Sequence, residues 1–122
     1  MEKLLKQALL FDFYGELLTE HQKQVYEEVV LEDYSLSEVA EERGISRQGV
    51  HDLIKRCNKV LSDYEDKLHL VEKFLKIQKT VEEIDALATT KVEADNLQAV
   101  QAEYRHVMEQ IKALTDGILK EI

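Results

Sequence analysis

Residues 36–61 constrain this chain most, because they match the template of a helix-turn-helix at nearly every position. The motif needs a small residue where its two helices cross, which Ala40 supplies, and a turn residue free to take positive φ, which Gly44 supplies. Ser46 stands where an N-cap would open the second helix. Arg43, at a position that is usually apolar, departs from the template. The apolar contacts between the two helices are expected from Val39, Ile45, Val50 and Leu53.

The composition favours an all-α fold. The chain has 122 residues, no proline and four glycines, so little interrupts long helices. This length suits one small domain with an appended helical segment, and we divide it into a helix-turn-helix head at 1–61 and an extension at 62–122. The N-terminus lacks a signal pattern, and no uncharged apolar run approaches the roughly 20 residues that span a bilayer. We therefore expect a soluble cytoplasmic protein without membrane insertion.

Helix starts are marked by a Ser or Thr followed three residues later by Glu or Gln, the pattern of a capping box. Four such pairs organise the chain: Thr19 with Gln22, Ser35 with Glu38, Ser62 with Glu65, and Thr90 with Glu93. With these starts we expect six helices, at about 2–14, 20–32, 36–43, 47–61, 63–88 and 91–121. The first two should cover the inner side of the motif with Leu5, Ala8, Leu9, Val25, Val29 and Val30.

The extension carries two apolar seams with alternating steps of four and three residues, typical of packed helices. One seam is Leu70, Phe74, Ile77, Val81, Ile84 and Ala88, and the other is Leu97, Val100, Tyr104, Val107, Ile111, Leu114 and Ile118. A short connection between them favours an antiparallel hairpin. Further apolar residues beside the seams widen the stripe beyond what one partner helix covers, namely Val71, Leu75, Leu87, Met108 and Leu119. We expect a homodimer through this segment, with Tyr104, Ile111 and Leu114 at the interface.

The charge distribution limits where a polyanion could approach. The net charge is −9, yet residues 44–60 hold four basic residues against Asp52 alone. This second motif helix should bury Val50, Leu53, Ile54, Cys57 and Leu61 and present the others. The candidate nucleic-acid-binding residues are Ser46, Arg47, Gln48, His51, Asp52, Lys55 and Lys59. The alternative is a solvated face on a scaffold used for protein contacts, which Asp52 and the acidic head support. Glu41 and Glu42 then become candidate partner-binding residues.

No catalytic or metal chemistry is indicated. Cys57 is the only cysteine, which excludes an internal disulfide and a cysteine zinc site, and we expect it to be a buried core thiol. Asp66 with His69 and Glu103 with His106 repeat the carboxylate-x-x-His spacing of di-iron bundles. The neighbouring seam residues are apolar, so further inward carboxylates are missing and we expect no metal. Without a phosphate loop, nucleophile elbow or catalytic carboxylate pair, we expect no enzyme and no cofactor.

Two resemblances meet at these residues. The span from Leu17 to Leu61 resembles the fourth-region DNA-binding domain of bacterial sigma factors. More specifically, LLFDFYGELLT, LEDYSLSEVAEERGISRQGVHDLIKR and SDYEDKLHLVEKF resemble the YlxM family, small bacterial proteins associated with the signal recognition particle pathway. The resemblance covers roughly residues 9–75. It departs at Gly49, His51 and Leu53, where alanine, an aromatic and a polar residue are expected.

For this chain the YlxM resemblance implies a sigma-like helical head with a helical extension and a cytoplasmic accessory or regulatory role in protein targeting. The implied partners are the particle's GTPase, its receptor and its small RNA. Arg47, Gln48 and Asp52 match the recognition positions of the motif. Two other hypotheses stay open: a transcription regulator that reads DNA as a dimer, and a helical adaptor that binds no nucleic acid. Salt dependence and sequence preference would separate them.

Overall fold

The computed structural model describes residues 2–121 and confirms the all-α prediction, since this part of the chain contains helices and no strand. The helices are α1 (Lys3–Tyr14), α2 (Glu20–Tyr26), α3 (Leu36–Arg43), α4 (Arg47–Leu68), α5 (Leu70–Ala88) and α6 (Leu97–Glu121), with a 3₁₀ turn η1 (Gly15–Leu17) and a π-helical turn η2 (Glu27–Leu31). None of these helices is long and apolar enough to cross a membrane. The chain forms two compact units, residues 1–71 and 72–122, and the boundary along the chain falls within the first turn of α5.

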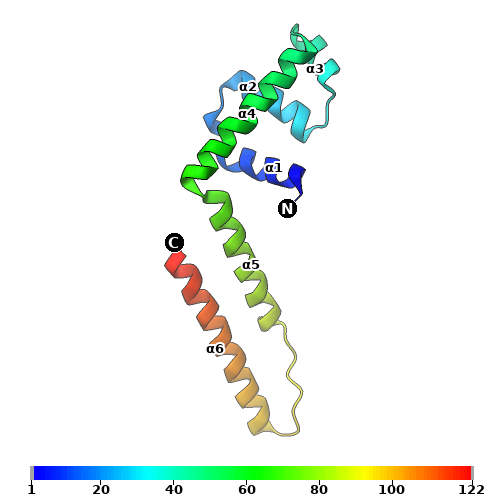
Figure 1. Ribbon diagram of the computed structural model, residues 1–122. Coiled ribbons are helices and arrows are strands. Elements are labelled where there is room, and N and C mark those ends of the chain that lie inside the picture. The colour runs from blue at the N-terminus through cyan, green and yellow to red at the C-terminus, as the bar shows by residue number, and fades with distance from the viewer. Residues whose placement is uncertain (1, 122) are drawn as a thin grey trace. The chain divides into compact units, whose positions relative to one another are not determined.

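The first unit, which we call the head, contains α1 to α4 and the start of α5 (Figure 1). Its helix starts follow the sequence signals: Thr19 forms the expected capping box with Gln22, and the Ser35 side chain accepts a hydrogen bond from the Glu38 amide at 3.1 Å. Helix α2 continues through the π turn η2, so the predicted helix at 20–32 is present with a widened last turn.

Three of the helices in the head contribute to one apolar cluster. Val25 of α2, Val39 and Ala40 of α3, and Val50 of α4 are buried together, and Leu53 packs against them. The prediction for α1 was wrong in one respect, because Leu5 keeps 52% of its surface exposed. A second set of side chains closes the core on the side of α1 and the distal half of α4: Leu10, Tyr14, Leu18, Tyr26, Cys57, Leu61 and Val71.

The end of α4 corrects the predicted helix break at Ser62. Helix α4 runs through Ser62 to Leu68 and ends at His69, which takes the left-handed conformation with φ 56°. The first amides of α5 are then capped from the head. The Leu70 amide donates to the Tyr14 hydroxyl at 3.1 Å, and the Val71 amide donates to Glu65 Oε1 at 3.0 Å.

The second unit, which we call the hairpin, is the antiparallel helix pair that the sequence predicts; α5 and α6 run side by side in opposite directions (Figure 1). The predicted start of the last helix at Thr90 was wrong. The Thr90 hydroxyl instead donates to the Ala86 carbonyl at 2.8 Å, beyond the end of α5. Asn96 caps α6, since its side-chain oxygen accepts a hydrogen bond from the Ala99 amide at 2.8 Å.

Candidate nucleic-acid interface

The helix-turn-helix is formed by α3, a tight turn and α4. Gly44 ends α3 with φ 68°, the left-handed conformation that glycine adopts without steric cost, and its amide bonds the Ala40 carbonyl. Ser46 opens α4, and its hydroxyl oxygen accepts a hydrogen bond from the Gly49 amide at 2.9 Å. These positions confirm the motif. Ile45 differs from expectation, since 38% of its surface stays exposed instead of packing between the helices.

Arg43, the residue that departs from the motif template, fixes α3 to the preceding helix. Its guanidinium donates to Glu28 Oε1 at 2.5 Å and to Gln24 Oε1 at 3.1 Å. The side chains of Arg43 and Glu28 are 20% and 17% exposed, so this ion pair is largely sheltered from water. An ion pair therefore takes the place of the usual apolar contact, and it holds the first motif helix against α2 and η2.

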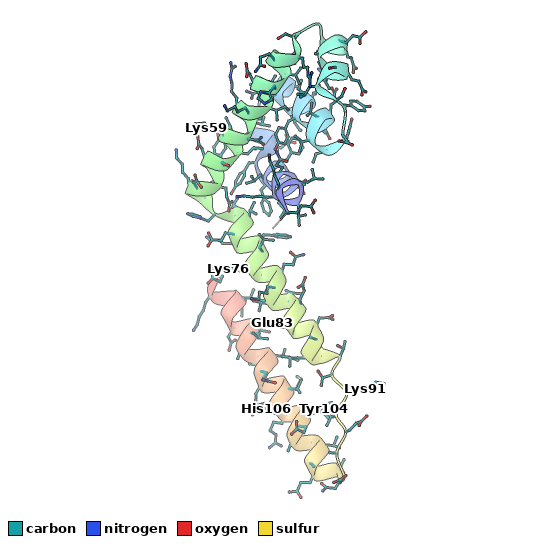
Figure 2. The ribbon with its side chains drawn as sticks, turned by 45° about the vertical axis from the view of Figure 1, so that its right-hand side comes forward. Lys59, Lys76, Glu83, Lys91, Tyr104 and His106 are labelled. Carbon is teal, nitrogen blue, oxygen red and sulfur yellow. The ribbon has the colours of Figure 1, made fainter. Side chains whose placement is uncertain are left out.

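The exposed face of α4 is a stripe of four polar side chains at helical spacing: Gln48, Asp52, Lys55 and Lys59. Opposite this stripe, Val50, Cys57 and Leu61 are fully buried, as predicted. Figure 2 shows Lys59 on the side of α4 that is turned away from the other helices of the head. We call this surface, together with the flanking His51 and Arg47, the outer face of α4.

The side chains on the outer face differ in how far they are already paired. Gln48 donates to Asp52 Oδ1 at 3.0 Å, and Lys59 pairs with Asp63 at 3.3 Å. His51 Nδ1 lies 3.7 Å from Asp52 Oδ1. Arg47 and Lys55 form no ion pair with any residue that the structure describes. These two cations therefore remain available for an anionic partner.

Arg47 lies at the edge of a shallow surface hollow where the two motif helices meet. The hollow is lined by Leu36, Arg47, Gln48 and His51. Its walls thus combine an apolar side chain, a guanidinium, an amide and an imidazole, which are groups able to contact a base edge or a phosphate. The hollow thus brings together three of the seven candidate nucleic-acid-binding residues, Arg47, Gln48 and His51, from the N-terminal turns of α4.

The nucleic-acid-binding residues predicted from the sequence do not include one exposed cation of α4. Arg56 lies on the flank of α4 opposite to His51, is exposed, and has no ion-pair partner within the described residues. The local charge count of residues 44–60 already included it, and that count was the signal that could have placed it in the candidate set. Arg47, Lys55 and Arg56 together form the set that we call the free cations of α4.

The buried side of α4 is held by contacts with α1 and α2. Cys57 is a free, buried thiol, as predicted, and burial raises its pKa to about 11. Next to it, Asn58 accepts hydrogen bonds from the Tyr26 hydroxyl at 2.7 Å and from the Gln7 amide at 3.2 Å. Burial raises the pKa of Tyr26 to about 12. These contacts fix the rotation of α4 and therefore the direction of its outer face.

The remaining candidate residues lie in separate places. Glu41 and Glu42 are exposed on α3, beside the motif turn. In the hairpin, Tyr104 is 48% exposed while Ile111 and Leu114 are half-buried. Among the described residues, the structure places no three acidic, histidine or cysteine side chains where they could hold a metal ion together.

Comparisons with a family model and with individual relatives point to the same family. Residues 1–104 match the model of family UPF0122, described as helix-turn-helix proteins like YlxM and p13. A UPF0122 protein of Acetivibrio thermocellus is 40% identical over 116 residues, covering 89% of this chain and 99% of its own length. A relative from Bacillus thuringiensis is 38% identical over 120 residues, covering 98% and 97% of the two chains. One from Caldanaerobacter subterraneus is 47% identical over 83 residues, covering 68% and 71%.

Proposed function

Because this chain belongs to the UPF0122 family of YlxM- and p13-like helix-turn-helix proteins, we propose that it is a non-enzymatic accessory protein of the signal recognition particle pathway. Its head contacts RNA or an RNA–protein surface through the outer face of α4. The resemblance to YlxM proteins supports the pathway. The observation that carries the contact is the position of two free cations, Arg47 and Lys55, on this outer face, with Arg56 exposed on the opposite flank of the helix.

These cations act by replacing the counterions around phosphates. Each lysine or arginine that meets a phosphate releases counterions, so affinity falls with added salt by a slope of roughly 0.7 to 0.9 per contact. Three free cations make a small electrostatic footprint. The chain as a whole carries a net charge of −9, which opposes the approach of a polyanion. We therefore expect weak binding that depends on this one helix.

The acidic side of the motif suits a second contact in the same complex. Glu41 and Glu42 are exposed on α3, next to the turn that leads into α4. Such carboxylates favour approach to a basic protein surface, such as that of an RNA-binding GTPase or its receptor, and they accelerate association at low salt. A ribonucleoprotein presents both signs of charge, so the two motif helices would address its two components.

The test is a titration of the full chain with the small RNA of the particle, the GTPase and the receptor, separately and combined, at two salt concentrations. Arg47→Ala and Lys55→Ala should each weaken RNA binding and lower its salt slope by about one contact. Lys79→Ala is the matched control, because it removes the same charge from an exposed position of α5. Equal binding by the double variant Arg47→Ala/Lys55→Ala and the unaltered chain would reject the proposal.

A transcription regulator that reads DNA is the second candidate. It is favoured by the hollow that gathers Arg47 and Gln48 at the start of the second motif helix, because guanidinium and amide groups suit guanine and adenine edges. Changing Glu41 and Glu42 to Lys separates the candidates. A DNA reader should bind DNA more tightly after this charge reversal, whereas association with a basic GTPase surface should slow. Sequence-selective DNA binding without binding to any particle component would favour the regulator.

A further inference from the structure

The hairpin leaves a row of apolar side chains in water. None of the described residues of α6 is buried, although the helix is 25 residues long. Leu97, Tyr104, Met108 and Leu119 expose 72%, 48%, 63% and 64% of their surfaces, and Val81 of α5 exposes 49%. Two helices alone give each helix a single neighbour, so their widened apolar stripes cannot be covered within the hairpin.

These exposed residues lie on one side of the hairpin. On α5, Glu83 and Leu87 lie toward α6, and Val81 is displaced from them by part of a helical turn. On α6, Met108 is displaced in the same rotational sense from Leu114. Because the two helices run antiparallel (Figure 2), the same rotational sense turns both sets toward one common side. We call this side the apolar face of the hairpin.

We propose that the apolar face binds a second copy of this chain, so that two hairpins stack into an antiparallel four-helix bundle. Helices α5 and α6 have 19 and 25 residues, so they are about 28 and 37 Å long, and each presents a strip roughly 10 Å wide. The resulting area, on the order of 700 Å² per chain, is close to the ~800 Å² per partner that stable protein interfaces bury. In the bundle each helix gains the second neighbour that the hairpin lacks.

In such a dimer, charged residues beside the apolar face of one copy lie opposite residues of the other sign on the second copy. Glu82 and Asp85 border the face on the outer edge of α5, and Arg105, Lys112 and Asp116 border it on the outer edge of α6. A two-fold axis parallel to the helices places α5 of one copy against α6 of the other, so the edge with Asp85 meets the edge with Lys112 on both sides. This self-complementarity favours a second copy over an unrelated protein.

The register along the helices brings two of these charges to the same level. Residues 83, 86 and 87 of α5 and residues 110, 113 and 114 of α6 line one hollow of the hairpin. Asp85 is therefore level with Lys112, and the two-fold axis sets it opposite the partner's Lys112. Lys112 already contacts Asp116 on its own helix at 2.6 Å, so the partner's carboxylate would extend an existing ion pair.

The first experiment is analytical ultracentrifugation of the full chain. We expect a dimer at a protein concentration on the order of tens of micromolar, which suits ordinary dimer affinities. Met108→Asp should raise the dissociation constant at least about tenfold, because it places a charge in the apolar interface. Leu4→Asp is the matched control, since Leu4 is 50% exposed on α1 and lies outside the apolar face. A monomer at this concentration would overturn the proposal.

A charge swap then tests the arrangement of the pair. Asp85→Lys and Lys112→Asp each place like charges opposite one another, twice in a symmetric dimer, and should weaken it about tenfold. The double variant restores opposite charges and should dimerise as the unaltered chain does. Circular dichroism confirms that each variant keeps its helices. A double variant weaker than both single variants would reject the stacking of α5 on α6. This test is independent of nucleic-acid binding by the head.

Discussion

The Tyr14 hydroxyl donates a hydrogen bond of 2.6 Å to Glu65 Oε1, and this pair joins the first helix of the head to the end of the fourth. Both groups also accept a hydrogen bond from a free amide at the start of α5, those of Leu70 and Val71. Burial and the contact with Glu65 raise the pKa of Tyr14. The helix break at His69 is thus stabilised by a tertiary contact from α1.

Tyr14→Phe should lower the free energy of unfolding by about 1–3 kcal/mol, because the hydroxyl bonds a carboxylate and leaves the Leu70 amide without its acceptor when removed. The side chain of Tyr14 is 1% exposed, so water cannot fully replace these bonds. Chemical denaturation measures the change. Tyr64→Phe is the control: its ring stacks on Tyr14 at 6.0 Å, and its hydroxyl has no hydrogen-bond partner among the described residues. Equal losses in the two variants would contradict the prediction.

The helix break also shows what the sequence could not predict. The stretch around Ser62 has the residues of a capping box, yet the helix continues there because Leu61 is buried in the core and Tyr64 packs on Tyr14. The real break at His69 has no local glycine or asparagine to mark it. One of its two capping groups, Glu65, is close in sequence, but the other is Tyr14, more than fifty positions earlier, and a local pattern does not contain that contact.

The motif itself was predictable, because its requirements are local. A small residue at Ala40, a left-handed turn at Gly44 and a capping serine at Ser46 follow one another at fixed spacing, and each has one physical role. It was harder to predict which charged side chains of the outer face form ion pairs. Which cations remain free depends on whether carboxylates lie within reach, as Asp63 does for Lys59. The role of Arg43 likewise depends on its contact with Glu28 on another helix.

Gly44→Ala should destabilise the head by about 1 kcal/mol. A Cβ at Gly44 would meet no atom within 4 Å, so the cost comes only from the φ of 68°. Gly117→Ala is the opposite case, because Gly117 lies inside α6 with open space around its Cα. There the added methyl group should stabilise the helix by about 0.5–1 kcal/mol. Thermal unfolding of both variants measures these effects, and a gain in stability for Gly44→Ala would contradict the turn geometry.

Cys57 should resist alkylation at pH 8 in the folded protein and react rapidly in denaturant, because the buried thiol has a pKa of about 11. The same shift affects stability. The unfolded thiol loses its proton near 9.0, while the folded thiol keeps it up to about 11, so stability falls as pH rises through this window. Cys57→Ala should remove this part of the alkaline loss and leave the part due to Tyr26, whose pKa is raised to about 12. Rapid labelling of the folded chain would show that α4 opens.

The outer face of α4 contains one carboxylate among its cations, and this residue offers the sharpest test of nucleic-acid contact. Asp52 accepts a hydrogen bond from Gln48 and lies on the same exposed stripe as Lys55. Asp52→Asn keeps the size of the side chain and an oxygen that can accept the hydrogen bond from Gln48, but it removes the charge. A unit charge about 7 Å from a phosphate contributes roughly 0.6 kcal/mol in water, so RNA or DNA should bind about threefold more tightly.

Asp12→Asn is the matched control, because Asp12 is exposed on α1 and its replacement changes the net charge of the chain by the same amount. If nucleic acid meets the outer face of α4, the Asp52 variant should gain affinity and the Asp12 variant should change little, since charges farther away than a Debye length of about 8–10 Å are screened. Fluorescence titration with the small RNA at physiological salt measures both. Equal gains would show that the total charge governs binding, and the helix-turn-helix would then serve as a scaffold for other contacts.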